Sequence, residues 1–326
     1  MTPSIDTRLL APSDARDAAA ILRRGGTVAV PTETVYGLAA DATNPEAVAK
    51  IFAAKGRPSQ NPLIVHVADA GQLAAFAEVP AGWAVDCMAA FWPGPLSLVL
   101  PLRGGLAPAV TAELGTVAVR VPSHPTFQAI LREAAAPLAA PSANRSGRPS
   151  GTTWQAVYED LAGRIDAVVC DQPCLWGLES TVVDATGDHP LILRPGGVTL
   201  EDLRRVVSSA AGPSSDADQN ARSPGTRFKH YQPRARVMLV DRLDAADIDA
   251  AQAAVIGLND FVAEPALQYK KSRRCSDIAE YAATLYAFFR EADAAGVSVI
   301  LCQRVPEAGL GLALMDRLRR AAEENH

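Results

Sequence analysis

The chain has 326 residues, of which 48% are apolar and 21% are charged, and its formal net charge is −5. These values are ordinary for folded proteins and exclude a wholly disordered chain. No segment approaches the ~18 consecutive apolar residues of a membrane-spanning helix, and the N-terminus has no apolar signal-peptide core. We therefore expect a cytoplasmic protein with no membrane contact, and the length indicates two domains.

Residues 1–208 alternate short apolar runs with helical patterns, which is typical of an α/β domain. Asn44-Pro45 is a typical helix start, and Gly56 is a typical helix end because glycine tolerates a left-handed backbone. The predicted helices cover residues 14–24 and 45–55. The predicted strands cover residues 27–30, 63–67, 96–100, 117–121, 138–140, 167–170, 181–184 and 191–193.

A stretch rich in Ser, Ala, Asp and Gly at residues 208–221 is typical of a linker. We place the linker at residues 209–236 and a second domain at residues 237–326. Its pattern predicts a small Rossmann-like fold, although it has no three-glycine fingerprint for a dinucleotide. The predicted strands cover residues 237–240, 254–258 and 297–301, and the predicted helices cover residues 276–294 and 310–322.

Charge, cysteine and histidine usage narrow the function classes further. Neither domain has a large excess of basic residues, which argues against tight, salt-dependent binding of nucleic acid. The five cysteines are scattered and match no zinc or redox spacing, so we expect reduced and mostly buried thiols. With only five histidines the sequence argues against a metal cage, and metal ligands stay unassigned.

Three polar clusters stand at the predicted ends of strands and helices. Residues 31–38 offer three hydroxyls, two from threonine and one from tyrosine, beside a glycine. Residues 55–62 begin with Lys55 and Arg57, and residues 140–151 are rich in Ser and Gly. Fixed cations and small residues suit phosphate or ribose oxygens, and strand ends are the usual ligand positions in α/β sheets. Each cluster also has a simpler interpretation, as a turn, a solvated helix end or a flexible loop.

Two polar residues interrupt apolar strands. His66 lies in the strand 63–67, and Arg120 lies in the strand 117–121. A single strand histidine is more often a core residue, but a buried guanidinium needs an anion. Two interruptions in separate strands favour a shared polar pocket over two isolated core residues.

Seven segments match, in the right order, the motifs of one known family. They are PTETVYGL (31–38), KGRPSQNPL (55–63), FWPGPLSLVL (91–100), AVRVPSHP (118–125), APSANRSG (140–147), ESTVVD (179–184) and ILRPGG (192–197). Together they resemble the YrdC-like threonylcarbamoyl-AMP synthases. The segment SPGTRFKHYQP (223–233) and the helical patterns beyond it resemble the long, two-domain branch of that family. The resemblance implies a twisted YrdC-like α/β sheet domain joined by a long linker to a small Rossmann-like C-terminal domain.

The resemblance implies that L-threonine, bicarbonate and ATP give L-threonylcarbamoyladenylate and pyrophosphate, a nucleotidyltransferase reaction without a prosthetic group. Mg²⁺ is expected with ATP, and a downstream machinery is expected to transfer the threonylcarbamoyl group to tRNA, with at most weak or indirect tRNA contact by this chain. The residues implied for L-threonine are Thr34, His66, Arg120, Ala140 and Ser180. Those implied for ATP are Lys55, Arg57, Asn61, Thr116, Ser142, Ser150, Arg194 and Tyr231, with Lys55 and Arg57 near the phosphates.

The linker is expected to act as a lid. Its 28 residues can extend at most ~90 Å at ~3.3 Å per residue, whereas a domain of about 208 residues has a radius of gyration near ~17 Å. Segment 223–233 can therefore bring Tyr231, which matches the family's nucleotide-contacting tyrosine, onto ATP and shield the labile adenylate from water.

Two alternatives stay open at this point. One is a non-catalytic RNA-binding module of the same fold, against which the near-neutral charge balance of residues 1–236 argues. The other is the carbamoyl-transfer module of hydrogenase maturation proteins, which share this domain type but carry acylphosphatase-like and zinc-finger segments that the cysteine spacing here does not indicate. The sequence also departs from the family pattern in two places. Ser97 stands where threonine is common, and residues 226–229 vary the usual basic-aromatic run, which leaves the contacts of the lid open.

Overall fold

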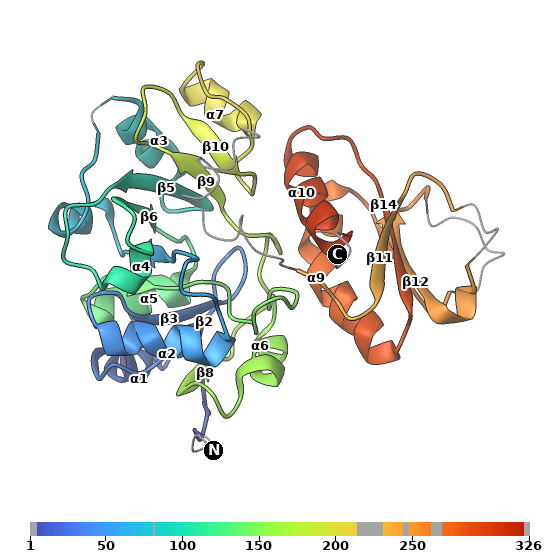
Figure 1. The fold of residues 1–326 in the computed structure, drawn as a ribbon, viewed down its shortest axis with the longest axis horizontal. Coiled ribbons are helices and arrows are strands. Elements are labelled where there is room, and N and C mark those ends of the chain that lie inside the picture. The colour runs from blue at the N-terminus through green and yellow to red at the C-terminus, as the bar shows by residue number, and fades with distance from the viewer. Residues whose placement is uncertain (1–4, 81, 214–230, 244–247, 262–268, 323–326) are drawn as a thin grey trace.

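The computed structural model describes residues 5–80, 82–213, 231–243, 248–261 and 269–322 (Figure 1). Two sheets organise these residues, one of ten strands and one of four. The protein therefore has the predicted α/β architecture with two domains. Within the described ranges, no helix is both long enough and apolar enough to cross a membrane.

The first domain contains a mixed sheet with the strand order β1-β8-β2-β3-β7-β4-β6-β5-β9-β10. The sheet combines parallel pairs, such as β4 with β6, and antiparallel pairs, such as β5 with β6. The strands are β1 (Arg8–Leu10), β2 (Val28–Val30), β3 (Gly37–Asp41), β4 (Ile64–His66), β5 (Leu96–Pro101), β6 (Thr116–Arg120), β7 (Leu138–Ala139), β8 (Ala167–Val169), β9 (Thr181–Asp184) and β10 (Leu191–Arg194).

Helices cover both faces of this sheet. Apolar residues of α1 and α5 pack on one face, and apolar residues of α2, α3, α4 and α6 belong to the core on the other face. The helices are α1 (Ala15–Arg23), α2 (Pro45–Lys55), α3 (Trp83–Phe91), α4 (Pro108–Thr111), α5 (Pro125–Ala134), α6 (Trp154–Leu161) and α7 (Leu200–Val206), with a 3-10 helix η1 (Ala70–Ala75).

Local sequence defines α2 as predicted. The Asn44 side chain accepts hydrogen bonds from the backbone N–H groups of Glu46 and Ala47 at 3.0 and 3.2 Å. Pro45 occupies the first turn, where its missing N–H costs nothing. Gly56 ends the helix with φ +62°, a conformation that glycine adopts without strain. These signals fix where the polar cluster 55–62 begins.

The strand β3 differs from the prediction, which has residues 31–38 as one loop. Gly37 and Leu38 instead begin β3, which pairs antiparallel with both β2 and β7. The sequence of β3, GLAAD, lacks the β-branched and aromatic residues that indicate a strand. It is a strand because its neighbours on both sides supply hydrogen bonds, so only residues 31–36 form the connection that the motif contributes to the site.

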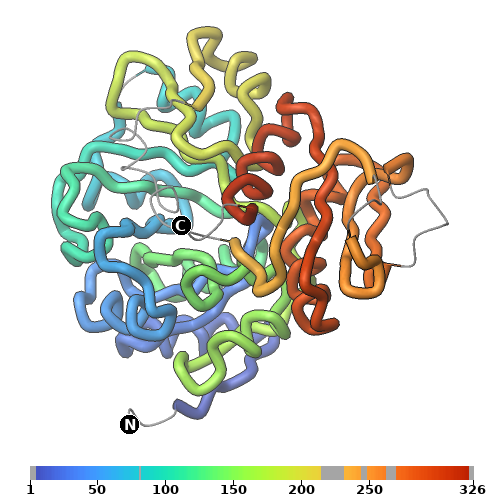
Figure 2. The backbone as a smooth tube through the Cα atoms, turned by 45° about the vertical axis from the view of Figure 1, so that its right-hand side comes forward, coloured from blue at the N-terminus to red at the C-terminus, as the bar shows by residue number. Residues whose placement is uncertain are grey.

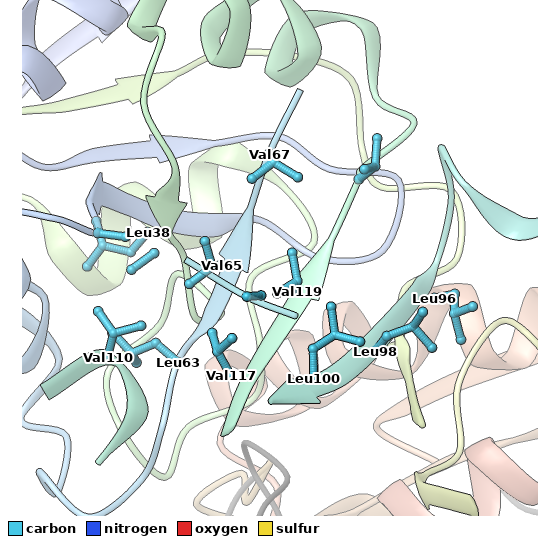
Figure 3. Close-up of a cluster of buried hydrophobic side chains, with 14 of the residues drawn as sticks. Leu38, Leu63, Val65, Val67, Leu96, Leu98, Leu100, Val110, Val117 and Val119 are labelled. Carbon is cyan, nitrogen blue, oxygen red and sulfur yellow. The ribbon is translucent and has the colours of Figure 1, made fainter. Parts of the chain in front are cut away.

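Side-chain alternation along β4, β5 and β6 separates an apolar face from a polar one. Val65, Val119 and Leu98 point into the main core with the other labelled residues of Figure 3. Residues one position away, including His66 and Arg120, therefore point to the opposite face. His66 and Arg120 are also direct partners in the β4–β6 register. This face of the sheet carries the polar site.

The second domain is a parallel four-stranded sheet with the order β11-β14-β12-β13. Its strands are β11 (Arg236–Val240), β12 (Ala253–Leu258), β13 (Lys271–Cys275) and β14 (Val299–Gln303), and its helices are η3 (Ala250–Gln252), α9 (Ile278–Ala295) and α10 (Leu310–Ala322). Figures 1 and 2 both show α9 and α10 between this sheet and the first domain. The Rossmann-like architecture is as predicted, except that the pattern gives no sign of the largely polar edge strand β13.

The predicted linker, residues 209–236, falls between the end of α7 and the start of β11. Its residues 214–230 lie outside the described ranges, and so does most of the predicted lid segment 223–233. The domain boundaries 1–208, 209–236 and 237–326 therefore stay a prediction. All five cysteines lie in described ranges, and all are free; four are buried, which confirms the prediction of mostly buried thiols.

Candidate active site

One cavity gathers most of the predicted site residues. All five residues predicted for L-threonine line it, namely Thr34, His66, Arg120, Ala140 and Ser180. Five of the eight residues predicted for ATP line it as well, namely Arg57, Ser142, Ser150, Arg194 and Tyr231. His66 and Arg120 share this cavity, which confirms the prediction of a common polar pocket.

Arg120 is held from three sides. Its Nη2 lies 2.7 Å from Glu33 Oε1, and its Nη1 donates to Thr34 Oγ1 at 2.9 Å. Its Nε donates to the carbonyl of Gly94 at 3.0 Å. Both side chains of the ion pair are buried, with exposed fractions of 4% for Arg120 and 7% for Glu33. The guanidinium is therefore fixed in one orientation before any ligand binds.

The partner carboxylate is ionised at neutral pH. Burial by itself would raise the pKa of Glu33, but the charge of Arg120 and hydrogen bonds from Arg120 and the Ser123 N–H lower it to about 2. An ionised partner keeps the buried Arg120 charge compensated. Sequence reasoning gave Glu33 no role of its own, although it lies within the PTETVYGL segment.

His66 is neutral at physiological pH. Burial and the nearby charge of Arg120 lower the pKa of His66 to about 3. Its ring lies 5.4 Å from the ring of Phe127, and its buried Nδ1 has no hydrogen-bond partner among the described residues. A neutral imidazole with an unused nitrogen can exchange a hydrogen bond with a ligand without adding charge.

Two cations line another part of the cavity, the buried Arg194 and the half-buried Arg57. Arg194 donates through Nε and Nη2 to the carbonyl of Ser180 at 3.2 and 2.9 Å. Arg57 donates to the carbonyls of Asn61 and Pro62 at 3.2 and 2.8 Å. Burial lowers the pKa of Arg57 to about 9 and also lowers the pKa of Arg194. Charges that burial disfavours gain most from a polyanionic ligand, so this part suits phosphate groups.

The other three predicted residues, all in described ranges, lie outside the cavity wall. They are Lys55, Asn61 and Thr116. Lys55 Nζ donates to the carbonyls of Ser142 and Asn144, each at 2.6 Å, and burial lowers its pKa well below the ordinary value. Lys55 therefore holds the loop behind the wall, and direct binding of ATP by these three residues stays a prediction.

Glu179 is a cavity residue that sequence reasoning assigned no role. Its Oε1 accepts from Ser150 Oγ at 2.6 Å, and its Oε2 accepts from Tyr286 OH at 3.1 Å and from Arg317 Nε at 2.9 Å. Burial would raise the pKa of Glu179, but the charges of Arg317 and Arg194 and hydrogen bonds from Ser150 and Arg317 lower it to about 2. Arg317 is 138 residues away in the other domain, so no sequence spacing could indicate this contact.

Tyr231 brings the end of the linker into the site. It is 5% exposed, lines the cavity and has φ +71°, which is unusual for a residue other than glycine. Its ring stacks on Tyr286 of α9 with 5.3 Å between ring centroids. The second domain therefore contributes to the packing of a cavity that lies mainly in the first.

Metal-binding side chains are not grouped in the described ranges, where no cluster of three or more His, Cys, Asp or Glu could hold an ion. The polar groups of the cavity are instead hydroxyls, guanidinium groups, backbone groups, one side-chain amide, one imidazole and one carboxylate. Such a wall can orient a small zwitterion beside Arg120 and a phosphorylated ligand beside Arg57 and Arg194.

Both domains match known sequence families. Residues 20–196 match the Sua5/YciO/YrdC profile, whose description is telomere recombination, and residues 198–323 match the profile of the threonylcarbamoyl-AMP synthase C-terminal domain. The chain belongs to the Sua5/YciO/YrdC family. The family indicated by the seven sequence motifs is therefore confirmed.

Relatives within this family match over nearly their whole length. The chain is 42% identical to the threonylcarbamoyl-AMP synthase of Bacillus subtilis, with 94% of this chain and 92% of that protein covered. It is 39% identical to the Pyrococcus abyssi enzyme of the same name, with 94% and 93% covered. The crystal structure of P. abyssi Sua5 complexed with L-threonine matches with a TM-score of 0.87 and 36% identity, over 97% of each chain.

Proposed function

We propose that this protein synthesises L-threonylcarbamoyladenylate from L-threonine, bicarbonate and ATP and releases pyrophosphate. The observation that carries the proposal is the single cavity in which the fixed Arg120 and the neutral His66 lie with the cations of Arg57 and Arg194. The full-length relatives named threonylcarbamoyl-AMP synthase supply the reaction, and the P. abyssi complex with L-threonine supplies one substrate. The protein would thus act as a nucleotidyltransferase.

The reaction needs positioning more than covalent help from the protein. The amine of threonine and bicarbonate combine to a carbamate with loss of water. A carbamate oxygen then attacks the α-phosphorus of ATP, and the bond to the β-phosphate oxygen breaks, so pyrophosphate leaves with that oxygen. Holding two anionic reactants together requires fixed opposite charges and little water. The buried guanidinium groups of the cavity meet that requirement.

The residue roles follow from the contacts. Arg120 would bind the threonine carboxylate, with Thr34, His66, Ser180 and the backbone at Ala140 around the rest of the amino acid. Arg57 and Arg194 would bind phosphates of the substrate MgATP, while Ser142, Ser150 and Tyr231 surround the remaining nucleotide. Lys55 would act indirectly, because it holds the carbonyls of Ser142 and Asn144.

The product would be consumed elsewhere. A mixed carbamic–phosphoric anhydride is hydrolytically labile, so we propose a cytoplasmic transfer machinery that moves its threonylcarbamoyl group to an adenosine of tRNA. The chain has a formal net charge of −5 and residues 1–236 are nearly neutral, which supports at most weak contact with tRNA itself.

Pyrophosphate release tests the proposal directly. We expect release from ATP only when both L-threonine and bicarbonate are present. An RNA-binding module of the same fold would show no such dependence, and neither would a carbamoyl-transfer module that does not use threonine. ATP turnover that is indifferent to threonine would contradict the proposed function.

A further inference from the structure

We propose that Arg317, on α10 of the second domain, is a positioning residue for the nucleotide part of the active site. It would act by holding Glu179 and Tyr231, which line the cavity that Arg317 does not itself reach. This inference rests on the proposed function, because it assigns the Arg194 part of the cavity to ATP. It gives the second domain a role in substrate binding.

Arg317 is fully buried where the two domains meet. Its side chain has an exposed fraction of 0%, and its Nε donates to Glu179 Oε2 at 2.9 Å. Its Nη1 lies 2.6 Å from Asp316 Oδ2, and its Nη2 has no hydrogen-bond partner among the described residues. A buried arginine that keeps one nitrogen unsatisfied is expensive, so its position is better explained by what it holds than by stability alone.

Glu179 connects Arg317 to the cavity wall through hydrogen bonds. One carboxylate oxygen accepts from Arg317 and Tyr286, and the other accepts from Ser150 Oγ at 2.6 Å. Ser150 lines the cavity and is 1% exposed. The orientation of a Ser150 hydroxyl that faces the nucleotide is therefore set by a carboxylate that the second domain holds in place.

Tyr231 is held by the same two residues of the second domain. Its ring stacks on Tyr286, and the guanidinium carbon of Arg317 lies 5.6 Å from its ring centroid, within cation–π range. The left-handed backbone of Tyr231 requires such support, since this conformation is unfavourable for residues with a side chain. Arg317 thus contacts two cavity residues, Glu179 and Tyr231, that are held from the second domain.

The chain also contains a matched interdomain ion pair that does not contact the cavity wall. Arg290 of α9 binds Asp160 of α6 with its Nη2 2.9 Å from Oδ2 and its Nη1 3.1 Å from Oδ1. Neither residue lines the cavity, and both are largely buried. Arg290 Nη2 also donates to the carbonyl of Pro149, the residue before Ser150. Loss of Arg290 therefore reports what weaker docking of the domains does while the contacts of Arg317 with Glu179 and Tyr231 are kept.

The test compares Arg317→Met, Arg317→Lys and Arg290→Met in the full-length chain. Titration calorimetry gives the Kd of ATP, and pyrophosphate release gives the KM values for ATP and L-threonine. We expect R317M to raise the Kd and KM for ATP about tenfold or more, while the KM for L-threonine changes less than about twofold. R317K should recover part of the ATP affinity, because lysine restores the positive charge but not the several N–H donors of the planar guanidinium group. R290M should leave ATP affinity within about twofold of wild type.

Several outcomes would overturn the inference. The first is wild-type ATP affinity in R317M. The second is an equal rise of the KM values for ATP and L-threonine in R317M. The third is a loss of ATP affinity in R290M as large as that in R317M. If R317M does not fold, as judged by thermal unfolding, R317K decides, and wild-type ATP affinity in R317K overturns the inference. Failure of the proposed function looks different, because wild type would then release no threonine-dependent pyrophosphate while the comparison of ATP Kd values still stands.

Discussion

Two buried carboxylate–guanidinium pairs support two parts of the cavity, and they differ in where the guanidinium comes from. Glu33 and Arg120 both belong to the first domain, whereas Glu179 of the first domain pairs with Arg317 of the second. In both pairs the carboxyl pKa is lowered to about 2 despite burial. The part of the site around Arg120 is therefore complete within one domain, and the part around Glu179 needs both.

This difference indicates that one part of the site is preorganised within the first domain, whereas the other part depends on the docking of the second domain. The proposed threonine site would keep its shape when the domains loosen, because Arg120 is held by Glu33, Thr34 and Gly94 alone. The proposed nucleotide site would respond to changes at Tyr286 of α9 and Arg317 of α10, which contact Glu179. Substitutions at the two pairs should therefore have separable effects on the two substrates.

The largest effect is expected from Arg120→Met. It removes the proposed carboxylate ligand and leaves Glu33 buried without its cation, which costs about 3–5 kcal/mol of stability. The KM for L-threonine should rise at least about 100-fold, since a buried charged contact is lost. Chemical unfolding and pyrophosphate release measure the two effects.

The double variant E33Q/R120M serves as its control. Removing both charges should restore part of the stability, because no isolated buried charge remains, but it should not restore threonine binding. A double variant with a wild-type KM for L-threonine would contradict the role of Arg120.

The stabilising effect of the ionised Glu33 and Glu179 should be lost in acid. Their folded pKa values of about 2 lie below the ordinary 4.5, so the unfolded chain binds more protons in between. The stabilisation is present above pH 4.5 and is lost as the pH falls toward 2, at about 3 kcal/mol per carboxyl. Glu33→Gln and Glu179→Gln should each be less stable than wild type at pH 7, with a difference that narrows in acid.

Urea unfolding at several pH values measures this loss, and Glu291→Gln is the control. Glu291 pairs with Arg273 on the surface, where an ion pair contributes little. The comparison becomes sharper if E33Q raises mainly the KM for L-threonine and E179Q mainly the KM for ATP. The interpretation is wrong if E33Q and E179Q are less stable than wild type by the same amount at pH 2 as at pH 7.

A smaller effect is expected at the close approach of the domains. Gly177 has φ +67°, and a Cβ there would overlap the backbone of Ala283 on α9. Gly177→Ala should lower the free energy of unfolding by about 2–3 kcal/mol. It should weaken the binding of ATP more than the binding of L-threonine, because α9 carries Tyr286. Gly296→Ala is the matched control, since Gly296 has φ +66° with nothing within 4 Å of the added Cβ, and should cost about 1 kcal/mol. Equal effects of both variants on ATP binding would show that α9 does not transmit the change.

The same contrast explains what the sequence could predict. His66 and Arg120 stood out because each interrupts an apolar strand, and their shared cavity follows from adjacent registers of β4 and β6. The helix α2 was predictable because Asn44, Pro45 and Gly56 are local signals. In contrast, β3 depends on pairing with β2 and β7, which its Gly- and Ala-rich sequence does not show.

The role of Glu179 could not be predicted for a related reason. The sequence gives Glu179 as the residue before Ser180, but its partners Tyr286 and Arg317 are 107 and 138 residues away on helices of another domain. On α10 the arginine pattern is that of an ordinary amphipathic helix. The packing of α9 and α10 against the first domain buries Arg317 and places its charge beside Glu179, where it opposes the effect of burial on the carboxyl pKa.

The smallest effect is expected at Ser97, which lies behind the cavity wall and contacts the cavity residue Ser180. Its Oγ lies 2.8 Å from Ser180 Oγ, and Ser180 Oγ also accepts from Arg194 Nη2 at 3.2 Å. Ser97→Ala should cost about 1 kcal/mol, the usual contribution of one buried hydrogen bond. Because Ser180 contacts both parts, the KM values for ATP and L-threonine should rise together, by no more than about threefold. Ser146→Ala is the control, since the buried Ser146 hydroxyl has no partner among the described residues and its loss should not destabilise the protein. A change in S97A confined to one substrate would assign Ser180 to that part alone and would sharpen the boundary between the two parts.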